Sequence, residues 1–308
     1  ADGGIRAECF VAATRSEAMY DRILFPTDGS DGASVVLDHA LDLAATHGAT
    51  VHLLYVADTT LTSSTRIQGR VVDALEGKGE RIVEEAKDRA ERRDLPVVTD
   101  VIQGEPYGTI VGYADAHDVD LVVMPTHGRQ GLKRYLLGST TERVVRRSNV
   151  PVLTVPLGSD GAIEYPYRDV LVPTDGSDCA DRALGSGIRM AKAGGAALHL
   201  LSVVSLTTFG AEIQDTLRAE DLTDRADELI EEATALAREE GVETVSGTVE
   251  RGRSVSRAIN SYVDEQGIDL VVMGTHGRTG LDRYVLGSVT ERLVRTASVP
   301  VLTIRGRE

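Results

Sequence analysis

The sequence predicts an α/β fold of two tandem doubly wound domains, each with a five-stranded parallel sheet. Three observations support this prediction. The chain repeats itself, and short strand-length segments alternate with longer segments of helical period. The short segments consist almost entirely of apolar residues, as in parallel strands that are buried on both faces. The 308 residues suffice for two domains, and the 42% of hydrophobic residues suffice for a core in each.

Two segments of the chain recur. Residues 26–31, Pro-Thr-Asp-Gly-Ser-Asp, return as residues 173–178, and residues 124–146 return as residues 273–295 with 17 of 23 positions identical. The two offsets are 147 and 149 residues. Two copies of one domain therefore make up most of the chain.

The repeat divides the chain into four parts. We expect a first domain at residues 19–156, a linker at 157–168 and a second domain at 169–308. The linker and the proline before it contain two prolines, two glycines and few core-forming residues. Residues 1–18 form an N-terminal extension that lacks the basic start, the apolar stretch and the cleavage site of a signal peptide.

Hydrophobic periodicity gives both copies the same order of elements. We expect strands in the first copy at 22–25, 51–56, 97–102, 121–124 and 152–155, and in the second at 170–172, 198–204, 244–250, 270–273 and 301–304. Helices of the first copy are expected at 31–46, 70–93, 106–117 and 139–147. In the first of these helices, Val35, Ala40, Leu41 and Ala44 are expected on the buried side.

The net charge limits the classes of partner. The 33 basic and 48 acidic side chains leave a formal charge of −15, so a nucleic-acid binder is not expected, because that role needs a basic face. A small phosphate ligand is still compatible, since backbone amides and a helix N-terminus hold it without net positive charge. Arginine outnumbers lysine 29 to 4 beside this acidic excess, and we interpret the composition as halophilic.

Cysteines and hydropathy bear on the compartment. Cys9 and Cys179 lie 170 positions apart with no zinc-ligand spacing, so neither a disulfide framework nor a zinc site is expected. No apolar run approaches the roughly 18 residues that would span a bilayer, so no membrane association is expected. We expect a cytoplasmic protein.

A glycine pattern follows the fourth strand of the second copy. Gly274, Gly277 and Gly287 let backbone approach a bulky anion, and Ser288 and Thr290 can cap the next helix, whose first amides would face that anion. This is the pattern of a phosphate cradle. Gly-Ser before a helix is also an ordinary start signal. The chain has no Walker loop, and no GxGxxG follows its first strand.

Asp28 and Asp175 follow the first strand of each copy. Ligands of open parallel sheets bind at the carboxyl ends of strands, so these carboxylates could accept a hydrogen bond from a ribose hydroxyl or a purine amino group. The alternative is that each aspartate only shapes its turn before glycine.

His127 and His276 have no neighbouring ligand or acid–base partner at suitable spacing. We expect loop histidines that hydrogen-bond backbone, and no catalytic or metal-ligating residue. Arg129 and Arg278, which follow in the same loops, are better placed to meet phosphate, although exposed arginines are more often solvated.

With these motifs the chain, from Met19 to its C-terminus, resembles the universal stress protein family in its tandem two-domain form. The resemblance rests on the Asp-Gly-Ser after the first strand and on the pattern Gly-x2-Gly-x9-Gly-[Ser/Thr], met by Gly274, Gly277, Gly287 and Ser288. That pattern marks the ATP-binding branch of the family. It implies an adenine nucleotide alpha hydrolase-like fold and a role in the stress response.

The resemblance also implies the site residues. Thr174, Asp175 and Val203 would surround adenine; Met273, Gly274 and Gly277 would lie near the ribose and α-phosphate; Gly287, Ser288 and Val289 would hold the outer phosphates. The matching residues of the first half are Thr27, Asp28, Val56, Met124, Gly128, Gly138, Ser139 and Thr140.

The first half departs from the pattern at one place. Pro125 stands where Gly274 stands in the second half, and proline has no backbone N–H to donate. We expect both halves to keep a pocket and the second half to bind nucleotide more tightly.

The leading functional hypothesis is a stress protein in which bound ATP or AMP controls regulation or partner binding. Mg or Mn would enter only as a counterion held by the phosphates. The alternatives are a slow ATP hydrolase, a related nucleotidyl transferase or ATP pyrophosphatase, and a regulatory domain pair that binds no nucleotide.

The resemblance further implies how the halves assemble. The last strands, within residues 151–155 and 300–304, would pair with one another and make an internal pseudo-dimer, which removes two exposed sheet edges. Whether two chains then form a homodimer stays open.

Overall fold

The computed structural model describes residues 19–59, 70–127, 137–157, 163–205, 215–277 and 286–305. Residues 1–18, with Cys9, lie outside these ranges. All fourteen elements expected from the sequence are present, and most ends differ from the expectation by one or two residues.

The two halves have the same order of elements. The first contains β1 (Arg22–Thr27), α1 (Asp31–His47), β2 (Thr50–Asp58), α2 (Arg70–Glu91), β3 (Val97–Gly104), α3 (Pro106–Ala116), β4 (Leu121–Pro125), α4 (Ser139–Arg147) and β5 (Val152–Val155). The second contains β6 (Asp169–Pro173), α5 (Asp178–Gly194), β7 (Ala197–Ser205), α6 (Asp215–Glu239), β8 (Val245–Gly252), α7 (Val255–Gln266), β9 (Leu270–Gly274), α8 (Ser288–Thr296) and β10 (Val301–Ile304).

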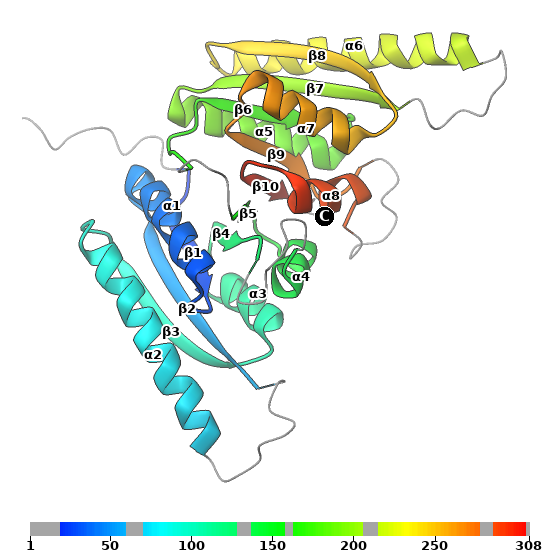
Figure 1. Cartoon of the computed structure of the whole chain (residues 1–308). Coiled ribbons are helices and arrows are strands. Elements are labelled where there is room, and N and C mark those ends of the chain that lie inside the picture. Colours follow the sequence, from blue (N-terminus) through cyan, green and yellow to red (C-terminus); the bar gives the residue numbers. More distant parts are fainter. Residues whose placement is uncertain are drawn as a thin grey trace, which may run out of the picture.

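The ten strands form one sheet in the order β3-β2-β1-β4-β5-β10-β9-β6-β7-β8 (Figure 1). Pairs within each half are parallel, and only β5 and β10 pair antiparallel, with Leu153 opposite Leu302. The predicted pairing of the last strands is therefore confirmed. The internal pseudo-dimer is a continuous sheet, in which each half reverses its strand order once, between β1 and β4 or between β6 and β9.

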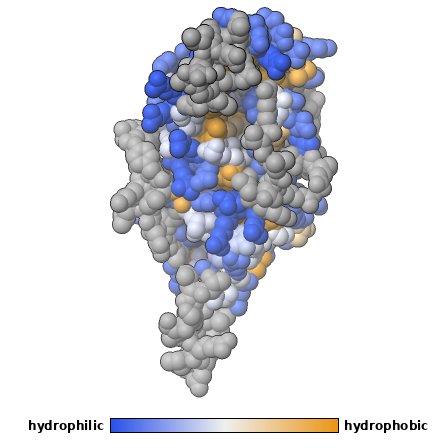
Figure 2. Space-filling view, turned by 90° about the vertical axis from the view of Figure 1, so that its right-hand side faces the viewer, coloured by the Kyte–Doolittle hydropathy of each residue, from blue (hydrophilic) through white to orange (hydrophobic). Residues whose placement is uncertain are grey.

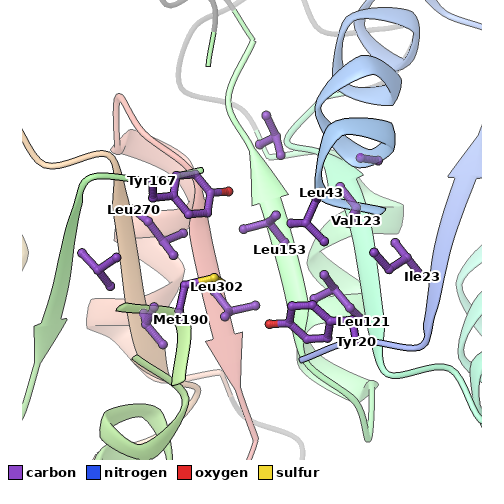
Figure 3. Packing of buried hydrophobic residues seen from close by; sticks show 14 of the residues in the cluster. Tyr20, Ile23, Leu43, Leu121, Val123, Leu153, Tyr167, Met190, Leu270 and Leu302 are labelled. Carbon is purple, nitrogen blue, oxygen red and sulfur yellow. The ribbon is translucent and has the colours of Figure 1, made fainter. Parts of the chain in front are cut away.

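Helices cover both faces of this sheet. Side chains of α1, α2, α5 and α6 join one hydrophobic cluster that runs through both halves. On the other face, α3 and α4 cover the first half and α7 and α8 cover the second, each with its own cluster. Figure 3 shows Leu153 and Leu302 side by side at the middle of the shared cluster, between Tyr20 and Tyr167.

The repeated helix after the first strand is capped in the same way in both halves. Ser30 begins α1 by accepting a hydrogen bond from the Ala33 N–H, and Gly48 ends it in the left-handed conformation. Ser177 and Gly195 do the same for α5. A serine N-cap and a glycine C-cap are common helix boundaries, so the local sequence marks both ends of these helices.

Two expectations about burial were wrong. Val35 is 68% exposed, because the buried face of α1 runs through Val36, Ala40 and Ala44 and position 35 lies off it. The strands expected at 97–102 and 244–250 are partly exposed, because β3 and β8 are the edges of the sheet. Burial on both faces holds for central strands such as β4 and β9.

The described surface in Figure 2 is mostly hydrophilic, with hydrophobic residues scattered among polar ones. In the described part of the chain, no helix is both long and apolar enough to cross a bilayer.

Candidate functional site

The candidate site lies at the carboxyl ends of the strands beside the switch in strand order. Thr27 at the end of β1 is level with Tyr55 of β2, and Asp28 and Val56 are the next residues in each segment. In the second half Pro173 is level with Leu201, and Asp175 and Val203 each follow two residues later in the chain. Ligands of doubly wound sheets bind in the crevice at this edge.

The two aspartates shape the turns after β1 and β6. In the second half, the Asp175 Oδ1 accepts a hydrogen bond from the Ser177 N–H at 3.1 Å, and the Thr174 hydroxyl oxygen accepts one from the Gly176 N–H at 3.2 Å. The Asp28 turn repeats this, at 2.9 Å to the Ser30 N–H. The turn role considered from the sequence is therefore present in both halves.

Gly277 brings the loop after β9 against the Asp175 turn. A Cβ built at Gly277 would lie 2.6 Å from the Asp175 Oδ2. Any side chain at position 277 would thus displace the carboxylate or the loop. Asp175 and Gly277 are both exposed, so this meeting point is open to solvent.

The N-terminus of α8 faces the same edge. Gly287 is the N-cap and donates its N–H to the Thr275 carbonyl at 2.8 Å, while the Thr290 hydroxyl donates to the Gly274 carbonyl at 2.8 Å. The expectation that Ser288 and Thr290 cap the helix was wrong, because Thr290 bonds the end of β9 and no side chain in the described residues caps α8.

An uncapped N-terminus favours anions. The first amides of an α-helix have no partner within the helix, and the helix dipole adds partial positive charge there. The first half repeats the arrangement: Gly138 is the N-cap of α4 without a side-chain cap among the described residues, and Thr141 donates to the Pro125 carbonyl at 3.0 Å. Ser139 and Ser288 are exposed at these two helix starts.

Gly274 has a packing role that the sequence analysis missed. A Cβ at this position would lie 2.9 Å from the Cys179 Sγ and the Cys179 carbonyl carbon, so α5 packs directly against the end of β9. The repeat offset places Gly32 where the second half has Cys179. The first half thus combines the small Gly32 with the larger Pro125, and the second half combines the larger Cys179 with the small Gly274. This opposite change of residue size at two repeat positions was the sequence signal that the two positions are in contact.

The Gly274→Ala variant is expected to lower the free energy of unfolding by about 1–3 kcal/mol, because the added methyl group overpacks the contact with Cys179. Chemical denaturation measures this loss. Gly185→Ala in α5 is the matched control, since a Cβ there would approach only the Arg189 guanidinium, at 3.9 Å, and alanine favours helix. Equal stability of the Gly274→Ala variant and the parent would contradict the packing role.

The two loop histidines hydrogen-bond a side chain. The Nδ1 atoms of His127 and His276 lie 2.9 Å from the hydroxyls of Thr126 and Thr275, whereas we expected backbone partners. Desolvation lowers the pKa of His127. Within the described ranges, no group of three His, Cys, Asp or Glu residues could hold a metal ion.

The remaining predicted residues fall into three groups. Met124, Met273 and Thr174 are buried under the site, and Thr140 and Val289 are half-buried in the first turns of α4 and α8. Gly128, Arg129 and Arg278 lie outside the described residues. The sequence analysis also did not select Leu137 and Leu286 as residues next to the site. The sequence does carry a signal for them, because a leucine directly precedes Gly-Ser in both copies.

The strand order and the glycine-capped helix after the fourth strand define a class: tandem doubly wound α/β proteins whose halves join through their last strands. Within this class, the chain belongs to the universal stress protein family. The sequence profile of the universal stress protein family matches residues 19–156 and 166–305, which is both halves.

Known relatives resemble one half or the whole chain. Two universal stress proteins of Methanocaldococcus jannaschii are 34% and 33% identical over 142 and 154 residues; these matches cover 45% and 44% of this chain and 84% and 95% of the relatives. The crystal structure of a universal stress protein from Archaeoglobus fulgidus covers 92% of this chain and 98% of its own, with a TM-score of 0.71 and 24% identity. That structure supports the tandem fold.

A universal stress protein solved in complex with cAMP matches 45% of this chain and 98% of its own, at 26% identity and a TM-score of 0.36. Its ligand is a property of that protein, and nothing about the ligand of this chain follows from the match.

Proposed function

We propose that this chain is an adenine-nucleotide-binding universal stress protein, in which ATP or AMP at the candidate site controls regulation or partner binding in the stress response. One observation carries the proposal: Asp175, Gly277 and the N-terminus of α8 converge at the switch-point edge. A carboxylate that can meet a ribose or purine donor lies there beside backbone amides that can meet phosphate.

The division of labour within the site follows from chemistry. Val203 would offer apolar contact for a base, beside the acceptors of Thr174 and Asp175. Met273, Gly274 and Gly277 would lie near the ribose and α-phosphate, and the amides after Gly287 would donate to the outer phosphate oxygens. Mg or Mn would be held by the phosphates and water, as is usual for Mg²⁺ with nucleotides. The first-half site would use Thr27, Asp28, Val56, Met124, Gly128, Gly138, Ser139 and Thr140 in the same roles.

Titration of ATP into the full chain by calorimetry tests the proposal. The Asp175→Ala variant is expected to bind about 10–100-fold more weakly at the second-half site, because it loses a charged acceptor. Asp175→Asn is the matched control, since its amide oxygen can keep the turn bond to Ser177. If the unmodified chain takes up no ATP or AMP, or if Asp175→Ala binds as the parent does, the proposal is wrong.

The same variants compare the two halves. Asp28→Ala weakens the first-half site and Asp175→Ala weakens the second-half site, so each variant reports mainly on the other half. Pro125 in the first half stands where Gly274 stands in the second. We propose that the second-half site is the tighter of the two. Nucleotide turnover measured in the same samples tests the alternative of slow ATP hydrolysis.

Three further parts of the proposal rest on the sequence alone. The domain limits 19–156 and 169–308 with a linker at 157–168 follow from the repeat. The halophilic origin follows from the acidic excess over 29 arginines and 4 lysines, and the cytoplasmic location from the cysteine usage.

A further inference from the structure

Two leucines cross from one half of the chain into the core of the other. Leu286, from the second half, is 3% exposed and belongs to the first-half cluster, together with Met124 of β4 and Val144 of α4. Leu137, from the first half, packs against the second-half cluster, which contains Met273 of β9. The two leucines hold the same position in the repeat, so the exchange is reciprocal.

Each crossing leucine directly precedes the N-cap of a helix whose first amides could bind phosphate. Leu286 precedes Gly287, the N-cap of α8, and Leu137 precedes Gly138, the N-cap of α4. The side chain is thus held by one half while the amides that follow it serve the site of the other half. Displacing the Leu286 side chain would move Gly287.

The helices behind these loops are also tied across the halves. The Arg295 guanidinium in the last turn of α8 lies 3.1 Å from the Glu142 carboxylate in the first turn of α4, and 2.8 Å from Glu291 in its own helix. Figure 1 shows α4 and α8 near the junction of β5 and β10. The ion pair therefore links α8 of the second half to α4 of the first.

We propose that Leu286 is a positioning residue for the second-half nucleotide site and Leu137 for the first-half site, so that neither site is complete without the other half. This inference rests on the proposed function. Nucleotide contacts depend on where the first amides of α8 and α4 lie. Leu286, buried in the first-half cluster, and Leu137, half-buried against the second-half cluster, anchor these helix starts, whereas the serines two residues after them are exposed.

The test is ATP titration into the full-length Leu286→Ala variant in an Asp28→Ala background, where the first-half site is weakened and the second-half site dominates binding. We expect at least 5-fold weaker binding there, the lower end of ordinary coupling between sites. A merely structural role predicts unchanged second-half affinity, because the cavity left by Leu286 lies in the first-half cluster. Should the alanine variant lose its far-UV circular dichroism, Leu286→Val serves in its place.

Three matched variants complete the experiment. Leu54→Ala truncates another leucine of the first-half cluster, on β2 and not next to the N-terminus of α8. It is expected to leave second-half affinity within about 2-fold of the parent. Leu286→Met should restore the affinity because it restores the volume. Leu137→Ala in an Asp175→Ala background should weaken the first-half site.

The outcomes separate the two proposals. If the unmodified chain binds no adenine nucleotide, the proposed function fails and this inference fails with it. If the unmodified chain binds and Leu286→Ala keeps its second-half affinity, or Leu54→Ala loses as much, only the positioning role is overturned.

Discussion

Replacing Leu302 by alanine is expected to lower the free energy of unfolding by about 2–5 kcal/mol. Leu302 is fully buried on β10 and lies opposite Leu153 of β5, at the strand pair that joins the halves. Both leucines belong to the cluster that continues through α1, α2, α5 and α6. The cavity would therefore weaken the cores of both halves at once.

Denaturant unfolding followed by circular dichroism measures this effect. Because the cluster is shared, we expect one transition that shifts as a whole rather than the loss of one half. Val35→Ala is the control: that side chain is 68% exposed, and its truncation should change stability by less than about 0.5 kcal/mol. A Leu302→Ala variant as stable as the control would show that the halves do not share a core.

Lowering the pH from 7 to about 4 is expected to destabilise the chain through His39. This side chain of α1 is 4% exposed, and its Nε2 lies 2.8 Å from the hydroxyl of Tyr167. Burial lowers the pKa of His39 from 6.5 to about 4. The folded state therefore resists a proton that the unfolded chain accepts.

The direction of the effect follows from that difference. A histidine with a lowered pKa contributes full stability above the unfolded value of about 6.5, and this contribution is lost as the pH falls toward about 4. The gap between the two pKa values corresponds to about 3 kcal/mol. Desolvation also lowers the pKa of His47 and His52, so those residues act in the same direction.

Comparison with His39→Gln isolates the contribution of His39. Glutamine can keep a hydrogen bond to Tyr167 and does not titrate, so the variant should lose less stability between pH 7 and pH 4 than the parent. Denaturation midpoints at several pH values give the comparison. Identical pH profiles for the parent and the variant would contradict the role of His39.

Local sequence was sufficient for the elements of this fold. Helical periodicity marks α1, and unbroken apolar runs mark β4 and β9, so these elements lie where they were predicted. The serine and glycine caps of α1 recur in α5, for which no residue range was predicted. The buried side of α1 was found correctly at Ala40, Leu41 and Ala44, but in the first turn it passes through Val36 rather than Val35. The burial of β3 and β8 was overestimated because the residues of a strand do not show whether another strand pairs with it on both sides.

The candidate site was predicted by position and only partly by role. The glycine pattern located the loops after β4 and β9, and the repeat located the aspartate turns. The sequence did not show that Thr290 bonds the Gly274 carbonyl or that Gly274 makes room for Cys179, because both contacts join residues far apart in the chain.

The sequence by itself determined the duplication, the element order and the pattern of phosphate-type loops, because these depend on spacing and periodicity along the chain. Only the tertiary structure decided that the halves share one sheet and one core, and that Leu137 and Leu286 each enter the opposite half. The physical reason is that burial depends on which surfaces meet. Two equal copies carry equal apolar patterns, and only their packing shows which leucine fills which core.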